Sequence, residues 1–107
     1  MKASLSTHVL DQVSGRPAAG LAVTLLASQT ILATAETNAD GRVPRLAESL
    51  SPGVYTLRFA TGPWFAAQGG ACFYPQVEIT FVMTGDLGHY HVPLLLSPYG
   101  FATYRGS

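Results

Sequence analysis

The sequence is a succession of short segments rich in β-branched and aromatic residues, which glycine, proline, asparagine and aspartate interrupt. Within these segments apolar and polar residues alternate, as is typical of strands that are buried on one face. The strands predicted in this way span residues 5–10, 20–27, 30–37, 54–60, 73–83, 90–96 and 99–105. Short strands separated by turn residues predict an all-β sandwich or barrel.

One segment departs from this pattern. Residues 63–69 begin with proline and end with glycine, an order that favours a short helix. The chain has 107 residues, which fits a single domain over residues 1–107 with one hydrophobic core.

The chain carries few charges. Charged residues make up 11% of the sequence, with six basic and six acidic side chains, whereas soluble domains average about 25%. We therefore expect another subunit to cover part of the surface. The balanced charge and the lack of a basic patch argue against nucleic acid or a membrane as partner.

Cysteine content indicates the compartment. Cys72 is the single cysteine, so no intrachain disulfide can form, which suits a reducing environment. We see neither an apolar run of signal-peptide length nor one long enough for a membrane helix. The sequence therefore predicts a cytoplasmic protein.

The three histidines are the first candidates for chemistry. Histidine titrates near neutral pH and is the usual proton shuttle. His89 and His91 lie two apart on a predicted strand, so their side chains should share a face. His8 lies on the first predicted strand. Three interpretations stay open from these residues alone: acid–base catalysis by His8 and His91, a metal site of three imidazoles, and ordinary surface histidines.

Two further segments carry polar groups. Arg42 follows a strong turn signal at residues 38–41 and could present its fork of donors to a planar ligand with carbonyl oxygens, or be a solvated charge. Residues 104–107 place tyrosine, arginine and serine after an apolar strand, although such a segment could simply fray. Motifs for nucleotide binding and for a serine nucleophile elbow are absent from the sequence.

Taken together, these segments resemble the 5-hydroxyisourate hydrolases of the transthyretin-like family, nearly from end to end and in the family's order. The matching segments are LSTHVLD at 5–11, GRPA at 15–18, TNADGR at 37–42, HVPLLLSP at 91–98 and YRGS at 104–107. The last of these separates the hydrolases from transthyretin itself. Each motif alone is weak, but their order is highly specific.

The resemblance implies a transthyretin-like β-sandwich of two four-stranded sheets with one short helix. It implies a homotetramer, built as a dimer of dimers, with active sites in the channel between dimers. The implied reaction is hydrolysis of 5-hydroxyisourate to 2-oxo-4-hydroxy-4-carboxy-5-ureidoimidazoline in urate (purine) degradation, without a metal or organic cofactor.

The resemblance also assigns residues. By position, the implied catalytic residues are His8, Arg42 and His91, and the implied substrate-binding residues are Tyr104, Arg105, Gly106 and Ser107. We expect His8 or His91 to activate water, and His89 either to support His91 or merely to lie near the channel. Two rival functions are an apolar-ligand carrier, which the polar site residues disfavour, and a structural sandwich module.

Overall fold

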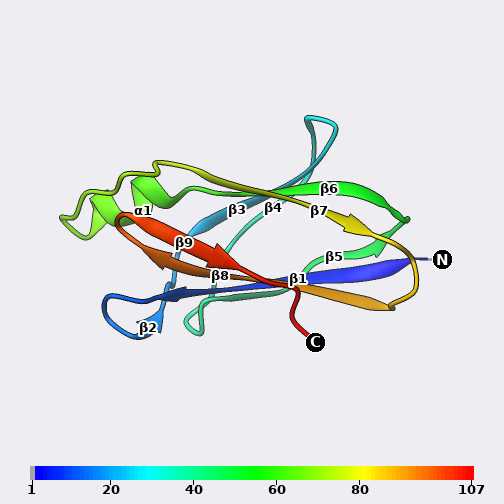
Figure 1. Cartoon of the computed structure of the whole chain (residues 1–107), viewed down its shortest axis with the longest axis horizontal. Helices are drawn as coiled ribbons and strands as arrows, with labels where there is room; N and C mark the ends of the chain where they lie inside the picture. The colour runs from blue at the N-terminus through cyan, green and yellow to red at the C-terminus, as the bar shows by residue number, and fades with distance from the viewer. Residues whose placement is uncertain (1) are drawn as a thin grey trace.

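The computed structural model describes residues 2–107 and shows two β-sheets packed face to face (Figure 1). The first sheet contains β1 (Ala3–Asp11), β2 (Arg16–Pro17), β5 (Arg42–Leu50), β8 (His89–Ser97) and β9 (Gly100–Thr103). The second contains β3 (Ala22–Ala27), β4 (Thr30–Glu36), β6 (Gly53–Phe59) and β7 (Val77–Met83). A short helix, α1 (Thr61–Ala67), connects β6 to β7. The predicted all-β sandwich with a short helix is confirmed.

Strand β1 organises the first sheet. Along one edge it runs parallel to β8, from the pair Ser4–His89 to the pair Asp11–Leu96. Its other edge is shared, because β5 pairs with residues 3–8 and β2 with residues 10–11. The expectation of four strands per sheet therefore holds for the second sheet, whereas the first gains a fifth strand along one edge of β1.

The main element missing from the sequence prediction is β5. Its pairing with β1 shifts register twice, between Ala3 and Thr7, and Pro44 lies within it. Only Val43 and Leu46 of its nine residues are buried, so the two-residue period is lost. Strand β7 is also shorter than predicted, because residues before Val77 serve the helix: the carbonyls of residues 74 and 75 accept hydrogen bonds from residues 61 and 62.

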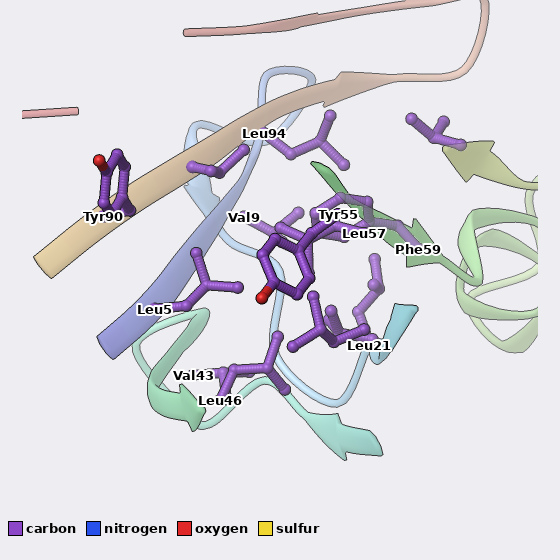
Figure 2. Packing of buried hydrophobic residues seen from close by; sticks show 14 of the residues in the cluster. Leu5, Val9, Leu21, Val43, Leu46, Tyr55, Leu57, Phe59, Tyr90 and Leu94 are labelled. Carbon is purple, nitrogen blue, oxygen red and sulfur yellow. The ribbon is translucent and has the colours of Figure 1, made fainter. Parts of the chain in front are cut away.

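Alternate residues of the central strands fill the space between the sheets (Figure 2). Leu5 and Val9 from β1 meet Leu57 and Phe59 from β6 in this core, and all four are fully buried. Burial of each large apolar side chain stabilises the fold by about 1.5–3 kcal/mol. Because strand side chains alternate, these inward residues oblige the even-numbered residues of β1 to face the outer side of the first sheet.

The hairpin between β3 and β4 contains backbone strain. Ser28 and Gln29 have φ angles of 49° and 71° at its turn, a region that disfavours side chains with a Cβ. We expect Gln29→Gly to stabilise the protein by about 1 kcal/mol, since glycine adopts such angles without the steric cost. Chemical denaturation measures the change. Gln76→Gly, at an exposed position without a positive φ, is the matched control and should not stabilise.

No helix among residues 2–107 is long and apolar enough to cross a membrane.

Candidate active site

The parallel pairing of β1 with β8 brings all three histidines to the outer side of the first sheet. Ser6 lies opposite His91 in the register of the two strands. Its hydroxyl lies 2.8 Å from Nε2 of His89 and 2.7 Å from Nδ1 of His91. His89 and His91 therefore share a face, as their spacing predicted. The meeting of the first strand with this late strand was beyond the sequence prediction.

His8 is oriented by the turn that precedes β5. Its Nε2 donates a hydrogen bond to the backbone carbonyl of Asp40 at 2.9 Å. A carbonyl oxygen can only accept, so Nε2 carries the hydrogen and Nδ1 of the neutral ring keeps its lone pair. His8 is thus held in one tautomer, with one nitrogen free to accept a proton.

The same turn sets the start of β5 at Arg42. The Asn38 side-chain oxygen accepts hydrogen bonds from the backbone N–H groups of Asp40, at 2.9 Å, and Arg42, at 3.0 Å. Gly41 has φ +73°, and a Cβ there would lie 2.5 Å from the carbonyl oxygen of Val9. A side chain at position 41 would therefore disrupt the turn. The turn places Arg42 directly opposite His8 in the pairing of β5 with β1.

His91 lies where positive charge is disfavoured. Burial lowers its pKa below the ordinary 6.5, and the positive charges of Arg42, His8 and His89 lower it further. The imidazole is therefore neutral at pH 7, the form that can accept a proton from water. The registers of β1 with β5 and β8 place Arg42, His8 and His91 on the same face of the first sheet.

The end of the chain lies against His91. The Gly106 N–H donates to the His91 carbonyl at 2.8 Å, forming an isolated bridge beyond β9. A Cβ on Gly106 would lie 2.5 Å from Cδ2 of the imidazole. The terminal segment is thus paired with β8 at Gly106, so the alternative that it simply frays is wrong at this residue. Glycine has no Cβ and therefore allows the backbone to lie this close to the imidazole.

Two residues of the terminal motif line a different part of the surface from Gly106. Tyr104 and Arg105 border a hollow at the open edge of the sandwich, together with apolar residues of β7 and β8. Hydrogen bonds from Thr84 and Tyr90 lower the pKa of Asp86, and the positive charge of Arg105 contributes to the same direction. The structure therefore joins Gly106 to the histidine face, while the binding roles of the four terminal residues stay a prediction.

Ser6 is the site residue that sequence reasoning missed. It lies two positions before His8, so the strand period places both side chains on one face. That spacing could have drawn attention to it. Within residues 2–107 the structure finds no group of three or more His, Cys, Asp and Glu side chains that could hold a metal ion.

The chain is similar to known proteins over nearly its whole length. Residues 5–106 match the model of the HIUase/Transthyretin family. The chain is 47% identical to a probable 5-hydroxyisourate hydrolase of Schizosaccharomyces pombe, over 97% of this chain and 91% of that protein.

Solved structures show the same similarity. The 5-hydroxyisourate hydrolase of Klebsiella pneumoniae matches with a TM-score of 0.92 and 42% identity, over 98% of this chain and 100% of the other. Sea bream transthyretin in complex with thyroxine matches with a TM-score of 0.89 and 30% identity, over 96% of this chain and 94% of the other.

Proposed function

The chain belongs to the HIUase/transthyretin family, and on that premise we propose that it is the hydrolase and opens the ring of 5-hydroxyisourate with water. The observation that carries this proposal is the gathering of His8, Arg42 and His91 on one face of the first sheet, which the strand registers fix. His91 provides a proton acceptor at neutral pH, and the hydrogen bond of His8 to Asp40 leaves its other ring nitrogen free. An apolar-ligand carrier has no use for these groups, although it shares the fold.

The proposed mechanism uses the protein's own side chains. A histidine, His91 or His8, takes a proton from water as the oxygen attacks the carbonyl carbon of the ring amide. Arg42 holds the carbonyl oxygen while negative charge develops there. The carbon–nitrogen bond then breaks, the leaving nitrogen takes the proton that the histidine accepted from water, and the ring opens to 2-oxo-4-hydroxy-4-carboxy-5-ureidoimidazoline. We propose that neither a metal nor an organic cofactor takes part.

An ultraviolet assay tests the activity. Urate freshly oxidised by urate oxidase supplies the substrate, and the protein is added with an unmodified C-terminus and a chelator. We expect the 5-hydroxyisourate absorbance to disappear faster than it does spontaneously, and deletion of residues 104–107 to abolish the acceleration. Decay at the spontaneous rate, in the presence of folded protein, would instead favour the carrier.

Arg42 provides a sharper test of oxyanion binding. We expect Arg42→Lys to lower kcat/KM by about tenfold, because an ammonium group cannot reproduce the planar fork of the guanidinium. The same assay measures it. Arg45→Lys is the matched control: it lies on the same strand, is exposed, and pairs with Glu48 at 2.7 Å. Equal losses in the two variants would exclude a specific role for Arg42.

We also propose that the protein acts as a homotetramer, a dimer of dimers. In the described part of the chain, β7 and β9 form the last strands of their sheets. Beside them lies the hollow lined by Ile79, Phe81 and Tyr104, and Val82 is 60% exposed. An apolar strand edge of this kind invites pairing with another chain. Light scattering on the purified protein would give the mass of four chains, and a monomer mass would reject the proposal.

A cytoplasmic location completes the proposal. Cys72 is a free, half-buried thiol, and the fold relies on no disulfide among the described residues. Such usage suits a reducing compartment. Fractionation of cells that express the full-length protein tests this assignment.

A further inference from the structure

A chain of hydrogen bonds connects His91 to Gly88, the residue just before β8. Nδ1 of His91 lies 2.7 Å from the Ser6 hydroxyl, and that hydroxyl lies 2.8 Å from Nε2 of His89. Nδ1 of His89 in turn lies 2.6 Å from the hydroxyl of Ser4, which donates to the carbonyl of Gly88 at 3.4 Å. Ser6 thus bridges the two imidazoles, and Ser4 lies at the outer end of this chain of hydrogen bonds.

The single hydroxyl proton of Ser6 couples the two rings. Ser6 can donate to one imidazole nitrogen and must accept from the other. When both rings are neutral, one of the two facing nitrogens therefore carries a hydrogen and the other does not. A change of tautomer in His91 then requires an opposite change in His89.

The Ser4 end of the hydrogen-bond chain selects between the two tautomer arrangements. If the Ser4 hydroxyl donates to the Gly88 carbonyl, it must accept from Nδ1 of His89, and Ser6 then donates to Nε2 of the same ring. Ser6 consequently accepts from Nδ1 of His91. This arrangement makes all four hydrogen bonds, whereas the reverse one loses the contact with Gly88.

From this geometry we propose that Ser6 is a positioning residue, which with His89 keeps His91 in the Nδ1–H tautomer and leaves its Nε2 lone pair free to accept a proton. The proposal rests on the proposed hydrolase function and adds two residues to its site. In the opposite tautomer Nε2 would already carry hydrogen and could take no proton from water.

The same chain of hydrogen bonds offers a route for the proton that His91 accepts. The protonated ring passes the hydrogen on Nδ1 to Ser6 as Ser6 passes its own to Nε2 of His89. The positive charge then resides on His89, and Ser6 ends the step with one proton, as it began. When Nε2 of His91 gives its proton to the leaving nitrogen, the reverse transfer through Ser6 returns a hydrogen to Nδ1 and restores the starting tautomer.

Nitrogen-15 NMR of the histidine-labelled protein tests the positioning role without substrate, because ring nitrogen shifts distinguish the two tautomers. We expect neutral His91 to be Nδ1–H in the unaltered protein. In Ser6→Ala the population of this form should fall. In His89→Ala it should fall too, since the freed Ser6 hydroxyl can donate to Nδ1 of His91. Ser97→Ala is the matched control, because that serine lies on β8 and bonds Gly100.

Kinetics provide the second readout. We expect kcat of Ser6→Ala to fall by about twofold, because the fraction of the competent tautomer drops from near one to about one half when the hydrogen bond no longer favours it. KM should stay unchanged because Ser6 is buried beneath the imidazoles. A His91 tautomer that is Nε2–H in the unaltered protein, or unaltered by Ser6→Ala, would overturn the proposal. Failure of the hydrolase function would show differently, as an unaltered protein that does not accelerate ring opening.

Discussion

Replacing His91 with asparagine is expected to lower kcat/KM for 5-hydroxyisourate by about two to four orders of magnitude, the usual contribution of a positioned proton acceptor. Asparagine retains a polar side chain of similar reach but cannot accept a proton at neutral pH. The ultraviolet assay measures the loss, and thermal unfolding verifies that the variant is folded. If neither this variant nor His8→Asn loses activity, the acid–base assignment is wrong.

The pH dependence follows from the lowered pKa of His91. Burial, assisted by Arg42, His8 and His89, favours the neutral ring, so the acid limb of kcat/KM should have its midpoint below 6.5. In Arg42→Gln one of these charges is removed, and the midpoint should move upward. An acid limb that lies above 6.5 in the unaltered protein would contradict this account.

Stability should respond to pH in the same direction. The folded-state pKa of His91 lies below the unfolded value, so the unfolded chain takes up a proton first as the pH falls. The stabilisation associated with neutral His91 is therefore complete above about pH 6.5 and declines as the pH falls toward the folded-state pKa. Denaturation at several pH values, compared with His91→Asn, isolates this contribution.

Gly106→Ala is the second substitution for which we expect a large effect. The added Cβ would lie 2.5 Å from Cδ2 and 3.2 Å from Cβ of His91, so either the imidazole or the terminal segment must move. A displacement of about 1 Å in a catalytic site can lower the rate about a hundredfold. We expect a loss of that size in kcat/KM with little change in the unfolding temperature, since the core is not touched.

Gly100→Ala provides the control for Gly106→Ala. Gly100 begins β9, and a Cβ there meets only the Ser97 hydroxyl oxygen, at an ordinary contact distance of 3.7 Å. This variant tests how much an added methyl group on the terminal strand lowers kcat/KM in general. Activity equal to that of the unaltered protein in both variants would show that the approach of Gly106 to His91 has no part in catalysis.

Local sequence determined the layered architecture and most of its strands. The alternation of Tyr55, Leu57 and Phe59 predicted β6, and the spacing of His89 and His91 predicted their common face. These patterns succeed because the two-residue period of a strand is a local property of the chain. The turn before Arg42 was also predicted from the sequence, since Asn38 and Gly41 have conformational preferences that depend on few neighbours.

Tertiary structure alone decided which strands meet. The parallel pairing of β1 with β8 brings Ser6 to His91, although 85 positions separate the two residues in the sequence. Strand β5 emerged only through its irregular pairing with β1, which breaks the periodic signal. Contacts between distant segments depend on the summed packing of the whole core, and no local pattern encodes them. For that reason the sequence could supply three candidate histidines, while the serine that couples two of them came from the fold.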